Sequence, residues 1–419
     1  MVYASFKGGC SFLKILCMEC GNPVGIIDKV YKCPKCGGLL DVEYDYDALA
    51  ETVQKLWSNR PLGVWKYSEL LPVLDKTLKV SIGEGGTRLV HCKRLGEKLK
   101  LKNLYVKDEG SNPTGSFKDR GMTVGVTKAL EFRVRNLICA STGNTSSSLA
   151  AYAARAGLNC IVLIPSGKIA LGKLAQALIY GAKVVAVKGN FDDALRIVVE
   201  LSSRPDFYLL NSLNPYRLEG QKTAAFEIHE QLGGRVPDWL IIPVGNAGNI
   251  SAYWKGFEEL ALLGLSELKP KMIGVQSKGA NPLVRAFKEG RDLTPLTQVE
   301  TVATAIRIGN PVNWRKAMRA VKKSNGLFED VDDNDIVEAQ KTLAKTEGIF
   351  TEPAGAAPIA YLMKHRDDGL IDADDVVVCV ATGSGLKDPD TAIRFSEKPA
   401  EIEADSKSIL NYLRRSELT

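Results

Sequence analysis

The chain has 419 residues, of which 45% are hydrophobic and 25% charged, and its 55 basic and 49 acidic residues give a formal net charge of +6. A chain of this length exceeds what one hydrophobic core supports, so we expect a globular protein of two or three domains. The charges are interspersed, which argues against a nucleic-acid-binding face. No apolar run is long enough to span a bilayer and no signal-peptide pattern opens the chain, so we expect a cytoplasmic protein.

Two CxxC pairs, each followed by glycine, lie near the N-terminus. They comprise Cys17, Cys20, Cys33 and Cys36, with twelve residues between the pairs. This spacing predicts a zinc ribbon, in which a small hairpin holds four thiolates around one structural zinc ion. The alternatives are four unligated thiols or a redox pair, and the lack of a surrounding βαβ pattern disfavours the redox pair. Since the segment has no dense Lys/Arg face with aromatic residues, we expect a folded appendage rather than a nucleic-acid-binding module.

The other cysteines and the histidines carry less information. The five remaining cysteines are Cys10, Cys92, Cys139, Cys160 and Cys379. They lie outside any ligand spacing, and the last three fall in apolar runs, so we expect inert buried thiols. None of the three histidines lies in a polar or glycine-rich motif, so a Ser-His-Asp site is not expected.

A helix and a linker are predicted over residues 44–65, and a glycine-rich loop follows at residues 81–89. Three glycines within four residues of that loop indicate a tight turn with an unusual backbone path. This pattern alone names no ligand.

The segment Asn-Pro-Thr-Gly-Ser-Phe-Lys-Asp-Arg-Gly at residues 112–121 follows a short strand predicted at 104–107. A helix is predicted from about residue 116 to 133, which puts Lys118 in its first turn. The helix dipole disfavours an ammonium group there. A lysine in such a place has a lowered pKa, which suits a neutral amine that attacks an aldehyde. The alternative is a surface lysine that merely follows a turn.

Strands and amphipathic helices alternate after Lys118. Strands are predicted at residues 136–140, 160–165, 182–187, 207–210, 240–243, 272–276 and 376–380, and helices at 148–156, 171–180, 192–202 and 215–232. This alternation predicts an α/β fold of parallel βαβ units, with two doubly wound sheets for a chain of this length. Ligands bind at the carboxyl ends of the strands in such sheets.

Three of those strand ends carry polar, glycine-rich loops, at residues 141–146, 244–249 and 381–387. The first two open helices and present N–H groups to a carboxylate or a phosphate. Taken singly, the serine-rich loop at 141–146 is equally explained as a helix cap. Together with Lys118, the three loops indicate one site for an anionic, aromatic cofactor and an anionic substrate.

With these motifs and Glu352-Pro353-Ala354, the sequence resembles the pyridoxal-phosphate enzymes of the tryptophan-synthase β-subunit fold type (fold type II), and within them the threonine synthases. The resemblance covers roughly residues 65–395 and implies two doubly wound parallel-sheet α/β domains behind an N-terminal zinc ribbon. The expected ranges are 1–60 for the ribbon segment, 65–100 with 206–395 for the large domain, 101–205 for the small domain and 396–419 for a C-terminal tail.

The resemblance assigns cofactor contacts to residues of this chain. Lys118 would form the internal aldimine and shuttle protons, Asn144 would bond to the phenolic oxygen, and Thr382 would meet the pyridine nitrogen as a neutral partner. The cofactor phosphate would be held by Gly245, Asn246, Ala247, Gly248 and Asn249.

The resemblance also implies the reaction, a β,γ-replacement that converts O-phospho-L-homoserine and water to L-threonine and phosphate. The helix that opens at Ser141, Thr142 and Thr145 would hold the substrate carboxylate. The substrate phosphate would contact Thr145, Ser212, Arg217 and Asn246, with Lys107 as a further candidate. A homodimer is the expected assembly, and neither nucleic acid nor membrane is an expected partner.

Several alternatives remain open at this point. Cysteate synthase, threonine or serine dehydratase and cysteine synthase share the fold type, the lysine and the loops. Dehydratases carry a run of glycines in the cofactor-phosphate loop, where this chain has Asn246 and Asn249. An alternative of a different class is a zinc-ribbon nucleic-acid-binding protein with a degenerate enzyme body, which would need a basic face that the sequence lacks.

Overall fold

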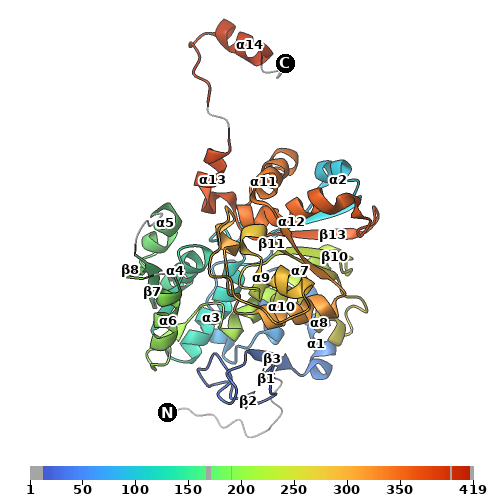
Figure 1. Ribbon diagram of the computed structural model, residues 1–419. Coiled ribbons are helices and arrows are strands. Elements are labelled where there is room, and N and C mark those ends of the chain that lie inside the picture. The colour runs from blue at the N-terminus through green and yellow to red at the C-terminus, as the bar shows by residue number, and fades with distance from the viewer. Residues whose placement is uncertain (1–12, 167–170, 190, 397–398, 416–419) are drawn as a thin grey trace.

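The computed structural model describes residues 13–166, 171–189, 191–396 and 399–415. Within them the chain forms three sheets, of three, six and four strands (Figure 1). The two larger sheets belong to the two α/β domains, and the smallest lies in the N-terminal module below them. None of the helices in the described ranges combines the length and apolar character needed to cross a membrane.

The small domain is built on four parallel strands in the order β8-β7-β6-β9. The strands are β6 (Asn136–Ala140), β7 (Asn159–Pro165), β8 (Lys183–Val187) and β9 (Phe207–Leu209). Successive side chains of a strand point to opposite faces. Leu137 and Cys139 therefore pack with helix α4, whereas Ile138 and Ala140 pack with α6. The helices are α3 (Lys118–Glu131), α4 (Asn144–Ala156), α5 (Leu171–Ile179) and α6 (Phe191–Leu201).

The large domain is built on six strands in the order β12-β11-β10-β13-β5-β4, all parallel except β4, which runs antiparallel to β5. The strands are β4 (Arg88–His91), β5 (Asn103–Asp108), β10 (Trp239–Pro243), β11 (Lys271–Ser277), β12 (Leu327–Val331) and β13 (Val376–Ala381). Leu240 and Ile242 face one core and Trp239 and Ile241 the other, so helices cover both faces of the sheet.

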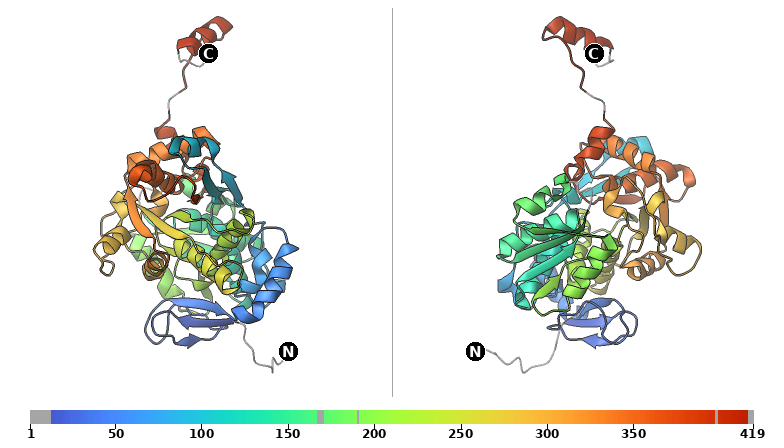
Figure 2. Two further views of the ribbon diagram at one scale, coloured as in Figure 1. Left: turned by 90° about the vertical axis from the view of Figure 1, so that its right-hand side faces the viewer. Right: turned by 60° about the vertical axis from the view of Figure 1, so that its left-hand side comes forward.

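The remaining helices surround this large sheet or extend from it. They are α1 (Tyr46–Ser58), α2 (Lys93–Leu99), α7 (Pro215–Gln231), α8 (Gly248–Leu262), α9 (Pro282–Lys288), α10 (Trp314–Lys323), α11 (Asp333–Glu347), α12 (Pro353–His365), α13 (Pro389–Arg394) and α14 (Ser406–Arg415). In Figures 1 and 2, α14 stands apart from the body of the molecule.

All seven strands expected after Lys118 are present, as are the four helices between them. The strand pairing nevertheless differs from the expected domain ranges. Strand β5, expected in the small domain, pairs with β13 and β4 of the large sheet. Strand β9, expected in the large domain, pairs with β6 of the small sheet. Local apolar patterns locate a strand, but hydrogen bonds to distant segments decide which sheet it joins.

The N-terminal module, residues 13–44, contacts both domains. Its antiparallel sheet consists of β1 (Leu13–Cys17), β2 (Pro23–Val24) and β3 (Leu40–Tyr44) in the order β2-β1-β3. On the small-domain side, Lys29 Nζ donates to the main-chain oxygens of Ser202 (3.4 Å), Arg204 and Phe207 (2.7 Å). On the large-domain side, Lys316 Nζ donates to Leu40 O at 2.7 Å. The module therefore joins the two domains at their common base.

Candidate active site

Lys118 is the first residue of α3, as expected, and the loop before it is fastened to the end of β13. The Phe117 N–H donates to the Thr382 carbonyl at 3.0 Å, and Ser116 forms a β-bridge with Gly383. Asp119 accepts hydrogen bonds from the Thr114 N–H (2.7 Å) and hydroxyl (2.6 Å). These bonds hold the lysine at the carboxyl edge of the large sheet, which is the ligand-binding edge of such sheets.

The amine of Lys118 lies in surroundings that favour its neutral form. The side chain is half-buried, and its Nζ lies 4.2 Å from the centre of the Phe117 ring. The pKa of Lys118 is lowered to about 7: burial is the largest cause, the charge of Arg217 acts in the same direction, and the charge of Glu352 opposes both. A lysine with a pKa near 7 has a large neutral fraction at physiological pH, which is the state that attacks an aldehyde.

A buried carboxylate, Glu352, joins Asn144 to Thr382. Asn144 Nδ2 donates to Glu352 Oε2 and Thr382 Oγ1 donates to Glu352 Oε1, both at 2.9 Å. Asn144 is the first residue of α4 in the small domain, whereas Thr382 follows β13 of the large sheet. The two expected ring contacts of the cofactor are therefore brought together across the domain boundary.

Arg217 lies in the first turn of α7 and is only 2% exposed. Its Nε and Nη2 atoms have no hydrogen-bond partner among the described residues. The pKa of this guanidinium is lowered to about 10 by burial, which Cys139 opposes. A buried cation without an anion costs several kcal/mol. The site therefore needs an anionic ligand at Arg217.

Close packing of α3 on α7 puts this guanidinium near Lys118. A Cβ on Gly121 of α3 would lie 2.9 Å from Arg217 O, and one on Gly125 would lie 3.3 Å from Arg217 Cγ. Neither position of α3 therefore accommodates a side chain. The two glycines let the two helices, and the two cations they carry, approach each other.

The loop 245–249 follows β10 and opens α8, as the sequence predicts. Ala247 has a left-handed backbone (φ 63°), and a Cβ on Gly245 would lie 3.1 Å from Ala305 O. Asn249 is buried, and neither polar atom of its side-chain amide has a partner among the described residues. Buried unpaired donors at a helix N-terminus form a site for a phosphate group.

The other expected substrate contacts lie around these two features. Asn313 holds two of these substrate-contact residues, Asn246 and Ser212, near each other. Its N–H donates to Asn246 O at 3.1 Å, and its Nδ2 donates to Ser212 O at 3.0 Å. Ser141, Thr142 and Thr145 lie at the opening of α4, beside Asn144. Thr142 is exposed and the other two are half-buried, so all three are within reach of a ligand.

Lys107 lies in a buried ion network. Its ammonium donates to Glu227 Oε2 (2.8 Å), Gln231 Oε1 (2.8 Å) and Thr87 O (2.9 Å), and the side chain is fully buried. Arg120 binds the same Glu227 carboxylate at 2.7 Å. Since an ammonium has three N–H bonds, these acceptors already use all of them. The geometry gives Lys107 a role in holding β5 to α7, and a substrate contact would require it to release one of these partners.

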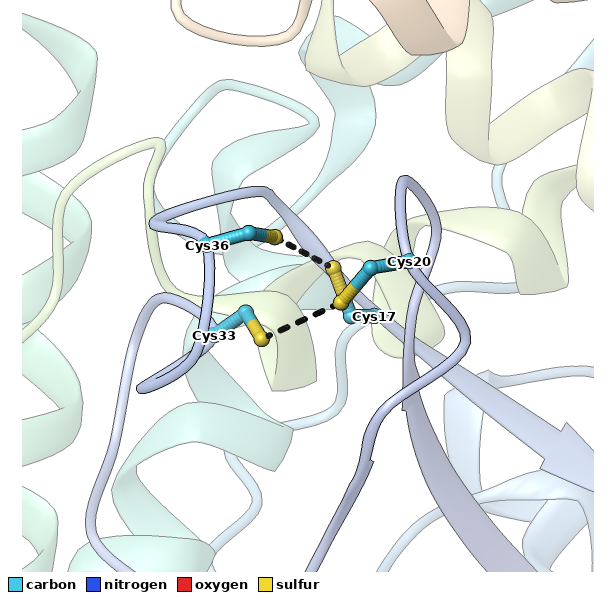
Figure 3. Close-up of side chains that lie close together, drawn as sticks. All are labelled: Cys17, Cys20, Cys33 and Cys36. Carbon is cyan, nitrogen blue, oxygen red and sulfur yellow. Dashed lines mark hydrogen bonds between the residues drawn. The ribbon is translucent and has the colours of Figure 1, made fainter.

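The four cysteine sulfurs of the N-terminal pairs converge, with all four Sγ atoms within 4.8 Å of one another (Figure 3). The Sγ atoms of Cys17 and Cys36 are 3.4 Å apart, and those of Cys20 and Cys33 are 3.7 Å apart. Sulfurs bound to zinc at about 2.3 Å in a tetrahedron lie about 3.8 Å from each other. Gly21 and Gly37 take left-handed conformations directly after each pair, which closes the two knuckles.

Cys92, Cys139, Cys160 and Cys379 are buried, in agreement with the sequence prediction, while Cys10 lies outside the described residues. Glu352 is the residue whose role the sequence reasoning missed. It is part of the Glu-Pro-Ala motif that carries the resemblance, but its partners lie 208 and 30 residues away along the chain. A carboxylate directly before a Pro-initiated helix is otherwise read as a cap.

Comparison with protein families places the chain among known proteins. The family model described as "Pyridoxal-phosphate dependent enzyme" matches residues 80–383. This range contains Lys118, Glu352, Thr382 and the loop at 245–249, and it excludes the cysteine module.

Two relatives and one solved structure are similar over most of their lengths. The threonine synthase of Methanocaldococcus jannaschii is 57% identical, over 95% of this chain and 98% of that protein. The threonine synthase of Methanosarcina acetivorans is 55% identical, over 94% of this chain and 96% of that protein. The processed form of threonine deaminase isoform 2 from Solanum lycopersicum superposes with a TM-score of 0.64 at 23% identity, covering 80% of this chain and 94% of that one, which supports the fold alone.

Proposed function

The chain belongs to the pyridoxal-phosphate dependent enzymes, and from this membership we propose how it works as a threonine synthase. It is a lyase that converts O-phospho-L-homoserine and water to L-threonine and phosphate. The observation that carries this function is the buried Arg217 guanidinium, two of whose nitrogens have no hydrogen-bond partner in the described part of the chain, and which lies close enough to Lys118 for their charges to interact. A dehydratase acting on threonine or serine has no substrate phosphate to neutralise such a cation.

The residues at this site fit pyridoxal phosphate. Bound there, the cofactor supplies an aldehyde that reacts with amines and a ring that stores negative charge. Lys118 offers a neutral amine, and the loop 245–249 with its unpaired Asn249 amide suits the phosphate group. Asn144 and Thr382 both donate hydrogen bonds to Glu352, which holds them near each other, and their side chains suit the polar atoms of the cofactor ring.

In the proposed mechanism Lys118 Nζ is the proton carrier. With the cofactor bound, the Lys118 amine would remove a proton from the substrate Cα and then from Cβ, and it would deliver protons at Cγ and again at Cα. The lowered pKa of Lys118 lets it accept and return these protons near neutral pH. Phosphate would leave from Cγ and water would add at Cβ while Lys118 holds or delivers these protons, and threonine would then be released.

Four side chains are proposed to hold the substrate phosphate. Arg217 presents a planar fork of donors to two phosphate oxygens, and Thr145, Ser212 and Asn246 serve the remaining ones. Burial of Arg217 limits the competition of water for its bonds, so the guanidinium would fix the leaving group in one orientation. Ser141 and Thr142 are proposed to bind the substrate carboxylate with the N-terminus of α4.

The reaction itself is tested with the purified, cofactor-loaded protein and O-phosphohomoserine. We expect equal amounts of phosphate and threonine to be released, and neither 2-oxobutanoate from threonine nor pyruvate from serine when these replace the substrate. A protein that deaminates threonine but leaves O-phosphohomoserine unchanged would contradict the proposal in favour of the dehydratase. The family membership already favours an enzyme over the zinc-ribbon nucleic-acid-binding alternative.

We also propose that Cys17, Cys20, Cys33 and Cys36 bind one structural zinc ion. The convergence of four sulfurs at distances near those of tetrahedral coordination supports this assignment. The homodimer and the cytoplasmic location stay predictions.

Metal analysis tests the zinc site. We expect about one zinc ion per chain in protein purified without chelators, and Cys33→Ser should lose most of it because a hydroxyl is a poor replacement for a thiolate. Local unfolding of the module should follow, detected as faster proteolysis within residues 13–44, with a nearly unchanged cofactor spectrum. The control, Cys160→Ser in strand β7, should keep its metal. A metal-free parent protein would refute the assignment.

A further inference from the structure

Helix α7 is held on the face opposite to Arg217. Residues two positions apart in an α-helix point about 200° away from each other, so Glu219 points away from Arg217. The Arg217 side of the helix packs on α3 at Gly121 and Gly125. On the other side Tyr44, the last residue of β3, donates from its hydroxyl to Glu219 Oε2 at 2.7 Å. Since both side chains are buried, water competes little for this bond.

Glu219 is also the centre of a buried ion network. Lys222 of α7 and Lys255 of α8 each lie 2.6 Å from one of its carboxylate oxygens. Burial alone would raise the pKa of Glu219, yet the charges of these two lysines bring it below its ordinary value. The ionised carboxylate thus has partners on β3, α7 and α8. It cannot move far from them without leaving a buried charge unpaired, which is strongly unfavourable.

The same network continues into the N-terminal module. Lys255 Nζ lies 3.0 Å from Asp41 Oδ1, and Asp41 is in β3 together with Tyr44. In the pairing of β1 with β3, Leu40 lies opposite Cys17, which is one of the four proposed zinc ligands. The strand that holds the far side of α7 is therefore fixed, through one neighbouring strand, to the cysteine cluster.

The unpaired guanidinium of Arg217 explains why α7 needs this support. Two nitrogens of the buried group lack partners among the described residues, which is unfavourable before a ligand binds. A rotation of α7 that moved Arg217 toward water would relieve this cost. The bonds at Glu219 oppose such a rotation, because they would have to break first. Supporting contacts of this kind hold a binding group in its productive position.

We propose that the N-terminal module is a positioning element of the substrate site. Through Tyr44 and the ion network at Glu219 it fixes α7, so that the Arg217 guanidinium stays in place for the substrate phosphate. The inference rests on the proposed role of Arg217. It gives the cysteine cluster a function in substrate recognition, because the cluster holds the strand that carries Tyr44.

Tyr44→Phe is the sharpest test, because it removes one hydroxyl and leaves the ring packing and both lysine partners of Glu219 in place. We expect the Kd of inorganic phosphate for the cofactor-loaded protein, measured by isothermal titration calorimetry, to rise about 2- to 10-fold, as for the loss of one hydrogen bond. The KM for O-phosphohomoserine should rise by a similar factor, while the visible spectrum of the cofactor stays unchanged.

Tyr67→Phe is the matched control. The Tyr67 hydroxyl donates to Glu230 Oε1 at 2.9 Å, so the same atom is lost from a bond to the same helix, but near the end of α7 rather than its start. Tyr67 lies outside the module, and its variant should bind phosphate as the parent does. Equal Kd values of the parent and Tyr44→Phe, or an equal loss of affinity in Tyr67→Phe, would overturn the inference.

Hydrogen exchange gives a second measurement, which needs no substitution in the module. Coupling between two sites is reciprocal, so if the module strengthens phosphate binding, phosphate must also strengthen the hold of α7 on the module. Saturating inorganic phosphate should therefore slow amide exchange at residues 40–44 of the cofactor-loaded parent, but not of Arg217→Ala. Unchanged exchange in the parent would contradict the inference.

The phosphate titrations also separate this inference from the proposed function. If Arg217→Ala binds inorganic phosphate as tightly as the parent, the proposed phosphate site itself is wrong. If the affinity depends on Arg217 but is the same in Tyr44→Phe and the parent, only the role of the module is removed.

Discussion

Lys118→Ala should lose turnover on O-phosphohomoserine by several orders of magnitude. The substitution removes the group that bonds to the cofactor aldehyde and the group that carries protons at the substrate Cα and Cβ. The rest of the pocket does not depend on this side chain, because the phosphate loop at 245–249 and the Asn144, Glu352 and Thr382 contacts lie on other segments. The variant should therefore still bind the cofactor, but without a covalent bond.

Borohydride reduction followed by mass analysis measures that bond directly. The parent should gain the mass of a reduced cofactor on the peptide that contains Lys118, and Lys118→Ala should gain none. Lys98→Ala, at an exposed position in α2, is a matched control that should behave as the parent. Near-normal turnover of Lys118→Ala, or labelling of a different lysine, would remove Lys118 from its role.

Arg217→Ala should have the second-largest effect. Loss of the bidentate cation should weaken stabilisation of the transition state by roughly 2–4 kcal/mol, or about 30- to 1000-fold in kcat/KM. Cofactor binding should change little, since the guanidinium is proposed to face the substrate phosphate. Arg217→Lys should restore only part of the activity, because an ammonium lacks the planar fork.

Product inhibition distinguishes the phosphate contact from a merely structural one. Inorganic phosphate should inhibit the parent in competition with O-phosphohomoserine, and it should inhibit Arg217→Ala far less. Arg135→Ala, which removes an exposed arginine, should keep the inhibition of the parent. Equal inhibition of the parent and Arg217→Ala would place the substrate phosphate elsewhere.

The sequence was sufficient to locate the strands that bury continuous apolar runs, such as β6 and β10, because burial on both faces leaves a simple pattern. It did not reveal β12, whose Leu-Phe-Glu-Asp-Val sequence places two acidic residues in its five positions. This strand lies at the edge of the sheet, where β11 is its one partner among the described strands, and an edge strand tolerates such charges.

In the candidate site, too, some features could be predicted from residues adjacent in sequence, whereas others depend on distant contacts. The position of Lys118 at a helix start follows from a turn next to it in the sequence. The burial of Arg217, the ion pairs that occupy Lys107 and the two partners of Glu352 depend on contacts between residues far apart in the chain. A residue type and its neighbours in sequence cannot show which of its hydrogen bonds are already used in the folded protein.

The contact between Lys29 and the small domain has a consequence for sequence divergence. The Lys29 ammonium donates hydrogen bonds to three main-chain carbonyl oxygens, and every residue type has such an oxygen. As far as this contact is concerned, positions 202 and 204 can exchange their side chains during evolution without loosening the module. Position 29 has no such freedom, because a long cation must reach all three oxygens from one place. The selective constraint from this contact thus falls on one partner.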